Sequence, residues 1–309
     1  MLDPAKIGLV AEAASRIGIR YYKITGGEPL SRRDIDSIVA SAKLYGRGEV
    51  SLTTNGYFLV DRLPALTDAG LDRINVSLHS LNGERYRALT GVNGLDRVLE
   101  GLSLARDLGV PVKLNYVLTR LNRDDLWDVL DYASQMGFNI NVIELIPVGE
   151  GGKRFSDLYV SITSIVKELL ERAEKIEVRD LQSRPRIVLP SGIYVELIAS
   201  YCNPYFCMGC TKIRLTHDGM LKPCINRNDN LVNLNPIFAA DISREEKVEK
   251  IVEAFSRANA LREPFFRIKN GVCVSYNKAI KGSPRFPLEI QQALLRHARS
   301  EEHSPSQPL

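Results

Sequence analysis

Apolar residues with the spacing of a helix alternate with short apolar runs typical of buried strands through the first half of the chain. A helix is expected from Pro4 to about Gly18, because Asp3 suits the N-cap position and proline suits the first turn. A strand is expected next, at 19–24. Four more helix–strand pairs are expected at 34–44 with 50–53, 57–69 with 73–77, 95–108 with 112–118, and 124–136 with 140–145.

This alternation predicts an α/β fold with a parallel sheet and right-handed crossovers, built either as a barrel or as an open doubly wound sheet. The pattern changes after Pro147, where a glycine-rich loop leads into short strands, a hairpin and a long helix expected at 243–258. We therefore expect one domain at 1–150, a smaller second region at 151–299, and a disordered polar tail at 300–309.

Composition excludes several classes of protein. With 309 residues and 44% apolar content, the chain can bury a full core, yet it has no apolar run of the ~18 residues that a membrane span needs. Its first residues lack the layout of a signal peptide. A net charge of +4 suits an anionic small molecule and falls short of a nucleic-acid-binding footprint. The chain has five cysteines, and three of them have the spacing of metal ligands rather than of a disulfide scaffold. This favours a reducing compartment, so we expect a cytoplasmic protein.

Three of the five cysteines have the spacing of metal ligands. Cys207 and Cys210 are two residues apart, and Cys224 returns after a segment that predicts a hairpin with an Asp-Gly turn. Three interpretations stay open on this spacing: an iron–sulfur cluster with one open iron, a zinc site completed by His217, or cysteines that bind no metal. Two further cysteines have no partner at ligand spacing and are expected to be buried as small apolar residues. These are Cys202 and Cys273.

Glycine-containing and polar motifs follow several of the expected strands. They are Thr25–Pro29, 53–56, Ser77 and 144–146. Because ligands bind at the carboxyl ends of parallel strands, these motifs are candidates for a site, and Glu28 could accept hydrogen bonds from an ammonium group. An ordinary turn is the alternative for each glycine motif. Four cations on strand-like segments would together clamp phosphate oxygens, although each alone is typical of a solvated surface. They are Lys23, Lys113, Lys212 and Arg214.

Taken together, these motifs resemble the radical S-adenosylmethionine (SAM) superfamily and, within it, the GTP 3′,8-cyclase family of molybdenum-cofactor biosynthesis. The resemblance covers about residues 3–226. Its most specific feature is Cys-x₂-Cys-x₁₃-Cys combined with the Gly-Gly-Glu-Pro strand end, which favours an iron–sulfur cluster over zinc. The other matching segments are Lys23–Leu30, Arg32–Asp34, Leu52–Gly56, Ile74–Leu78 and Ile143–Leu145.

The resemblance implies a partial (β/α)₆ TIM-like radical SAM barrel, with its first strand and cluster loop missing, and a smaller C-terminal auxiliary-cluster region. The auxiliary 4Fe–4S cluster would be held by Cys207, Cys210 and Cys224, and its open iron would bind the purine of GTP. The family's GTP-binding positions match Lys23, Thr53, Lys113, Lys212, Ile213 and Arg214. Its SAM-binding positions match Gly27, Ser77 and Ile146, the last standing where relatives often have methionine.

The implied reaction is that of a lyase. Reductive cleavage of SAM gives a 5′-deoxyadenosyl radical that abstracts a ribose hydrogen from GTP, and the new carbon radical attacks the guanine ring. The product is (8S)-3′,8-cyclo-7,8-dihydroguanosine 5′-triphosphate. The implied partners are GTP, SAM and a reducing electron donor, with a homodimer possible and neither nucleic acid nor membrane expected. No catalytic side chain is assigned.

The sequence also departs from the family. The Cys-x₃-Cys-x₂-Cys motif that holds the SAM-cleaving cluster is absent, and the first cysteine is Cys202. We expect a segment of about 40 residues carrying that motif, with a second 4Fe–4S cluster, to precede residue 1. Lys212 stands where relatives usually have arginine, His79 replaces a common aspartate, and the chain ends without the family's Gly-Gly tail. The alternatives are an inactive nucleotide-binding paralogue, another radical SAM enzyme with an auxiliary cluster, and a zinc-hairpin interaction protein.

Overall fold

The computed structural model describes residues 1–270, 272–276, 281 and 282, so the tail expected at 300–309 lies outside the described residues. The chain forms two compact units that interleave along the sequence. Unit 1 contains residues 1–77, 93–113 and 212–263, and unit 2 contains residues 78–92 and 114–211 together with the described residues from 264 onward. The expected boundary near residue 150 concerns a different division, by function, and stays a prediction.

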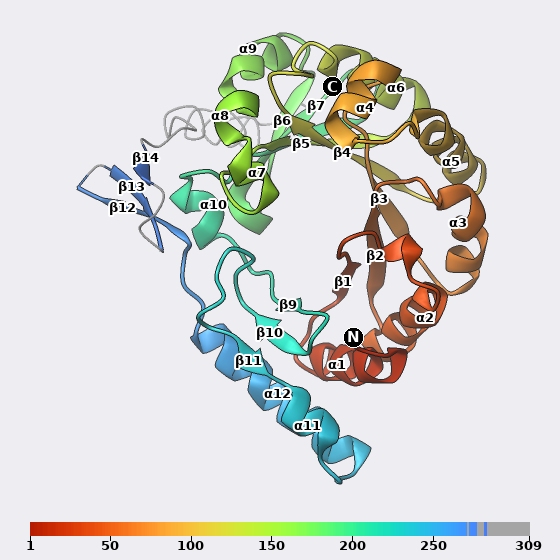
Figure 1. Cartoon of the computed structure of the whole chain (residues 1–309), viewed down its shortest axis with the longest axis vertical. Coiled ribbons are helices and arrows are strands. Elements are labelled where there is room, and N and C mark those ends of the chain that lie inside the picture. The colour runs from red at the N-terminus through yellow and green to blue at the C-terminus, as the bar shows by residue number, and fades with distance from the viewer. Residues whose placement is uncertain (271, 277–280, 283–309) are drawn as a thin grey trace, which may run out of the picture. The chain divides into compact units, whose positions relative to one another are not determined.

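Unit 1 begins with alternating helices and parallel strands (Figure 1). These elements are α1 (Pro4–Arg16), β1 (Tyr21–Ile24), η1 (Pro29–Ser31), α2 (Ile35–Gly46), β2 (Glu49–Thr54), α3 (Leu59–Asp68), β3 (Arg73–Ser77), α5 (Leu95–Asp107) and the first residues of β4 (Val112–Leu118). The later part of the chain adds β9 (Arg214–Leu215), β10 (Met220–Lys222), β11 (Val232–Asn233), α11 (Asn235–Ala239) and α12 (Arg244–Ala260). The expected strands at 73–77 and 112–118 agree with β3 and β4 residue for residue.

The three strands β1, β2 and β3 have one apolar face and one polar face. Ile24 pairs in register with Leu52, and Leu52 pairs with Ile74, so these apolar side chains share a face. The other face carries the row Lys23, Ser51 and Arg73. A parallel strand covered on both sides by helices is apolar throughout. The alternation therefore indicates that the helices of unit 1 cover one face only and leave the other polar.

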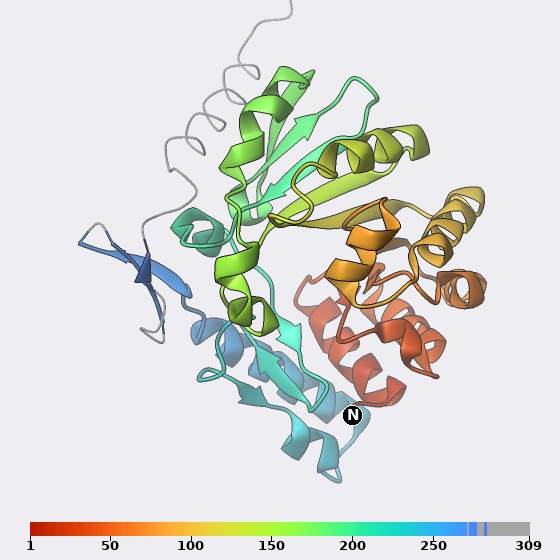
Figure 2. The same cartoon turned by 45° about the horizontal axis from the view of Figure 1, so that its top comes forward.

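A hydrophobic core joins the two ends of unit 1. Val10, Ala13 and Ala14 of α1 pack with residues of β10, β11 and α12, among them Ile251, which is completely buried. Figure 2 shows α12 and the three-stranded sheet of β9–β11 lying alongside α1. Two ion pairs, Arg244 with Glu12 and Arg16 with Glu245, connect the same helices at the surface. The 212–263 segment is thereby fixed against the helix that precedes β1.

Unit 2 continues the helix–strand pattern and then turns antiparallel. Its helices are α4 (Gly83–Thr90), α6 (Leu126–Met136), α7 (Glu150–Lys153), α8 (Phe155–Leu158), α9 (Thr163–Glu171), η2 (Leu181–Ser183) and α10 (Pro204–Met208). Its strands are the rest of β4, β5 (Asn139–Glu144), β6 (Lys175–Arg179), β7 (Arg184–Val188), β8 (Tyr194–Ile198), β12 (Phe266–Lys269), β13 (Val272–Ser275) and β14 (Lys281–Gly282). β5 and β8 are parallel, whereas β7 runs antiparallel to both β8 and β6.

Among the described residues the main sheet has the strand order β1-β2-β3-β4-β5-β8-β7-β6. The consecutive, parallel pairing of β1 with β2 and of β2 with β3, each across an intervening helix, is the pattern of an α/β fold. The predicted fold class, with mostly parallel strands and a smaller C-terminal region, is confirmed. The expected hairpin around Asp218-Gly219 is also confirmed, because β9 and β10 pair and Gly219 has a φ of +89°.

Candidate functional site

The polar face of β1–β3 carries three of the predicted site residues near the carboxyl ends of their strands. Lys23 is exposed on β1, Thr53 is partly buried on β2, and Ser77 is the last residue of β3. Thr53 pairs in register with Asn75, which is only 1% exposed and whose Oδ1 has no hydrogen-bond partner within the described structure. A buried amide oxygen without a partner is costly. Asn75 is therefore a further candidate, and its place between the buried residues Ile74 and Val76 is the signal that sequence reasoning missed.

The loop after β1 is held in a defined shape by Glu28. Its Oε1 accepts hydrogen bonds from the Leu30 N–H (3.0 Å) and from Thr54 Oγ1 (2.6 Å), and its Oε2 accepts one from the Asn55 N–H (2.7 Å). The oxygens of Glu28 thus join the loops after β1 and β2, and the expectation that Glu28 accepts hydrogen bonds from an ammonium group stays a prediction. Gly27 is exposed, and a Cβ added there would meet no atom within 4 Å. The backbone at this glycine is therefore open to a ligand.

The other predicted GTP-binding residues are Lys113 and three residues of the β9–β10 hairpin and its approach, Lys212, Ile213 and Arg214. Lys113, near the start of β4, is only 7% exposed. Lys212 and Ile213 lead directly into β9, which Arg214 begins, and Ile213 packs against the core of unit 1. Although nearly 190 residues separate Lys23 from Lys212 in the sequence, all six predicted GTP-binding residues belong to unit 1.

The β9–β10 hairpin is fixed from two sides. Nη1 of Arg262, just after α12, donates to the carbonyl oxygens of Lys212 (2.8 Å) and Pro223 (3.2 Å). The N–H of Leu2 donates to the carbonyl oxygen of His217 (3.0 Å). These contacts position the backbone at both the Lys212 and the Cys224 ends of the hairpin.

Lys222 lies opposite Arg214 in the hairpin and is a cation that sequence reasoning missed. Its Nζ donates to Asn228 Oδ1 at 2.6 Å. Burial and the neighbouring Arg214 charge lower the pKa of Lys222. Once the Asp-Gly turn is recognised, antiparallel pairing across the hairpin is the sequence signal that identifies this residue.

None of the three cysteines with ligand spacing is in a disulfide, and all three are partly buried. Cys207 lies on α10 and Cys210 two residues after that helix, and the Cys210 N–H donates to the Cys207 carbonyl (3.2 Å). Cys224 lies two residues after β10 and belongs to unit 1, whereas the other two belong to unit 2. Within the described residues, no group of three or more His, Cys, Asp or Glu side chains is gathered as a metal site. The hairpin turn residue His217 is exposed.

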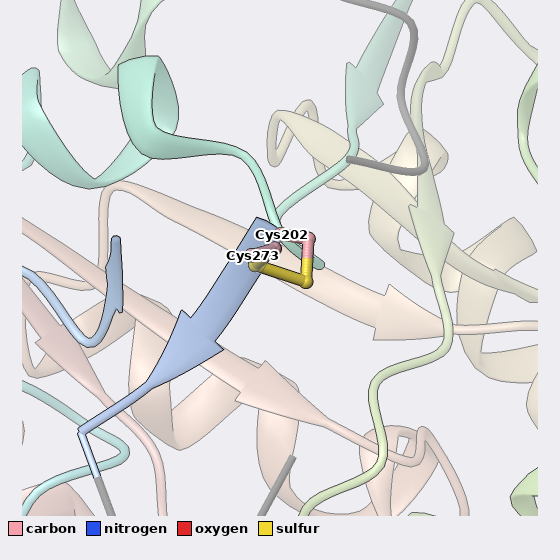
Figure 3. Close-up of a disulfide and its surroundings, with 2 residues drawn as sticks. All are labelled: Cys202 and Cys273. Carbon is pink, nitrogen blue, oxygen red and sulfur yellow. A yellow bond between two sulfur atoms is a disulfide. The ribbon is translucent and has the colours of Figure 1, made fainter. Parts of the chain in front are cut away.

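Cys202 and Cys273 form a disulfide in unit 2, with their Cα atoms 5.7 Å apart (Figure 3). Both are completely buried, as expected. The expectation that they have no partner is wrong, because they are bonded to each other. The partners are 71 residues apart in the sequence, so their spacing gives no sign of the pairing. The bond joins β13 to the loop that precedes α10.

The remaining predicted site residue and His79 both lie in unit 2. Ile146 follows β5 and is partly buried. His79 Nδ1 accepts a hydrogen bond from the Val117 N–H (3.2 Å), and burial lowers the pKa of His79 to about 4. The ring is therefore neutral at pH 7.

No described helix is both long enough and apolar enough to span a membrane.

Comparison with known proteins assigns the two halves of the chain to known families. The model of the radical SAM superfamily matches residues 1–133, and that of the Molybdenum Cofactor Synthesis C family matches residues 138–266. A Sulfurisphaera tokodaii protein described as a probable GTP 3′,8-cyclase is 45% identical over 271 residues, 87% of this chain and 86% of its own. A Metallosphaera sedula protein with the same description is 41% identical over 269 residues, 86% of this chain and 84% of its own.

Solved structures resemble this chain in fold. Streptococcus suis SuiB bound to S-adenosylmethionine matches with a TM-score of 0.56 and 16% identity, covering 77% of this chain and 59% of SuiB. Native anSMEcpe with bound AdoMet matches with a TM-score of 0.51 and 11% identity, covering 97% of this chain and 88% of that protein. At such low identities the likeness concerns the fold alone.

Proposed function

Because the chain belongs to the radical SAM superfamily and is a GTP 3′,8-cyclase of molybdenum-cofactor biosynthesis, we propose that its substrate site is built on unit 1. The proposed GTP-binding residues are Lys23, Thr53, Lys113, Lys212, Ile213 and Arg214. One observation carries this proposal: the core between α1 and α12 holds the β9–β10 hairpin in the same compact unit as Lys23, Thr53 and Lys113. Lysine and arginine side chains from both segments then supply the charge that a triphosphate requires.

The proposed SAM-binding residues are Gly27, Ser77 and Ile146. Gly27 is supported by the open space at its Cα and by the hydrogen bonds of Glu28, which hold the neighbouring backbone in place. Ser77 offers a hydroxyl at the end of β3, and Ile146 offers an apolar surface for the adenosyl group. In this arrangement the protein orients SAM through loop backbone and strand-end side chains, while SAM supplies the radical chemistry.

We assign an auxiliary 4Fe–4S cluster to Cys207, Cys210 and Cys224. The donor chemistry fits, because cysteine sulfur is the usual ligand of such clusters and these three cysteines lie outside the disulfide that joins the other two. A sulfur ligand of an iron–sulfur cluster often accepts a hydrogen bond, and Cys210 Sγ accepts one from Gln182 Nε2 at 3.3 Å. When bound, the cluster would supply an open iron for the purine. The five cysteines leave no set for the SAM-cleaving cluster, so no step through that cluster is derived.

The proposal also covers the division into domains, the electron donor, the location and the oligomeric state. Residues 1–150 would form the SAM domain, and 151–299 would carry the auxiliary cluster and part of the substrate site. An electron donor, a cytoplasmic location and a homodimer belong to this proposal as well. The polar face of β1–β3 and the modest net charge of +4 support a small anionic substrate over nucleic acid.

Binding of GTP to the reconstituted chain tests the proposal, measured anaerobically by isothermal titration calorimetry. Arg214→Ala should weaken GTP binding roughly 10- to 150-fold, since a hydrogen bond to a charged group contributes about 1.5–3 kcal/mol. The control is Arg244→Ala, which removes an exposed arginine of α12 that pairs with Glu12. Its affinity should match that of the unmodified chain. Equal affinities for the two variants would remove Arg214 from the site.

A further inference from the structure

Gln182 adopts a backbone conformation that glycine would adopt more easily. It lies in the turn between the antiparallel strands β6 and β7, with φ +64° and ψ 18°, and it is only 4% exposed. A side chain other than glycine costs free energy in this left-handed region. A buried glutamine at such a position points to a use for its amide group.

The turn lies directly against the segment that links two of the proposed cluster ligands. The Gln182 N–H donates to the carbonyl oxygen of Gly209 (2.8 Å), and its side-chain Nε2 donates to Cys210 Sγ (3.3 Å). A Cβ at Gly209 would lie 3.1 Å from the Cα of Gln182, closer than ordinary van der Waals contact. Glycine between Cys207 and Cys210 therefore permits the close approach that brings the amide to the sulfur.

The orientation of the amide is set from its other end. Arg184, 6% exposed, donates from Nη2 to Gln182 Oε1 and from Nη1 to Glu196 Oε1 (2.7 Å). A guanidinium has only donors, so the amide atom that faces it must be the oxygen. The NH₂ group is thereby directed to Cys210.

Positive charge gathers behind this amide. Completely buried Glu196 pairs with Arg184 and also with Arg179 (3.4 Å) and Arg186 (3.2 Å). Of these three arginines, Arg186 also lies opposite Glu177 in the β6–β7 pair, whereas Arg184 lies next to the amide. The Arg184 charge and the N–H donor both favour electron density on the Cys210 sulfur.

We propose that Gln182, oriented by Arg184, is a positioning residue that sets the reduction potential of the iron–sulfur cluster bound through Cys210. The inference rests on the proposed function, which gives Cys210 to that cluster. A hydrogen bond to a ligand sulfur stabilises the more negative, reduced state of a cluster, so it raises the potential. Gln182 touches neither GTP nor SAM in this scheme and acts only through the sulfur.

Gln182→Glu tests the proposal because it keeps the length of the side chain and its bond to Arg184 while replacing the donor with an oxygen. The reconstituted variant should show a midpoint potential lower by about 59 mV, corresponding to a tenfold shift in the one-electron equilibrium. The potential is measured by redox titration followed by electron paramagnetic resonance. Gln135→Glu, the same change at an exposed position on α6, is the matched control and should leave the potential unchanged.

A shift below threefold, about 28 mV, would overturn the role of Gln182. An equal shift in Gln135→Glu would also overturn it, because the effect would then be one of charge at a distance. If Gln182→Glu binds no cluster, Gln182→Met replaces it as a neutral side chain without a donor, judged by the same threshold. An unmodified chain that binds no iron would instead refute the cluster assignment itself, so the two failures are distinguishable.

Discussion

Replacing Glu28 by glutamine is a direct test of how the loop after β1 is held. In the native structure two backbone N–H groups, those of Leu30 and Asn55, donate to different oxygens of the carboxylate, and Thr54 Oγ1 donates to one of them. Glutamine has one oxygen and one NH₂ group. In either orientation of the amide, one of the two backbone N–H groups faces another donor.

The size of the effect follows from the number of bonds lost. The orientation that keeps the amide oxygen toward Leu30 and Thr54 loses only the charge-assisted hydrogen bond from Asn55, for a cost of about 1.5–3 kcal/mol. Asn55 is exposed, so water can replace its lost acceptor, and the lower end of that range applies. A loss of about 1.5 kcal/mol in local stability corresponds to roughly tenfold faster opening of the two loops.

Hydrogen–deuterium exchange measured by mass spectrometry detects this opening. Peptides covering 25–31 and 53–57 should exchange roughly tenfold faster in Glu28→Gln, and SAM should bind more weakly because Gly27 lies in the loosened loop. Asp61→Asn is the control, since it makes the same charge change in an exposed ion pair with Arg97, where little stability is at stake. Less than a twofold change in the Glu28 variant would show that the carboxylate does not hold the loops.

Two further predictions concern unit 2. Burial lowers the pKa of His79 to about 4, so between pH ~6.5 and 4 the unfolded state binds more protons than the folded state. The free energy of unfolding should therefore fall as the pH falls through that window, by up to about 1.4 kcal/mol per pH unit. Urea unfolding at several pH values, followed by the fluorescence of the single tryptophan, Trp127, should show this slope. His79→Gln keeps an acceptor for the Val117 N–H and should flatten the slope. Equal slopes in the two proteins would refute the role given to His79. Thiol titration of denatured but unreduced protein should detect three thiols, and five after reduction. Replacing Cys202 and Cys273 together by serine should lower the free energy of unfolding by about 2–4 kcal/mol, and five thiols before reduction would show that no disulfide exists.

The sequence predicted those helices and strands that can be recognised from the pattern of neighbouring residues. β3 and β4 were predicted at their observed ends because each is a buried run bounded by turns. Helix α4 was missed, since Tyr86 is its only buried residue and most of the others are charged or polar. β6 was missed for a similar reason, because it contains one buried residue, Ile176, among charged ones.

The site was predictable only where short motifs carry it. The Asp-Gly turn identified the hairpin, and ligand spacing distinguished Cys207, Cys210 and Cys224 from the two cysteines that form the disulfide. The bond between Cys202 and Cys273 and the contact of Gln182 with Cys210 join loops that no local pattern connects. Tertiary structure alone brings such pairs together, so single-sequence reasoning had no physical signal for them.

The shared core of α1 and α12 has a consequence for how the protein is made. Roughly 230 residues lie between Ala14 and Val248, and at about 5–20 residues per second a ribosome needs roughly 10–50 s to synthesise them. Throughout that interval the side of α1 that packs on α12 lacks this partner, so the nascent chain exposes Val10, Ala13 and Ala14 on that side while the strands after α1 are already being extended. Unit 1 therefore closes late in translation, and a chaperone that shields α1 during synthesis would raise the yield of folded protein more than one added after release.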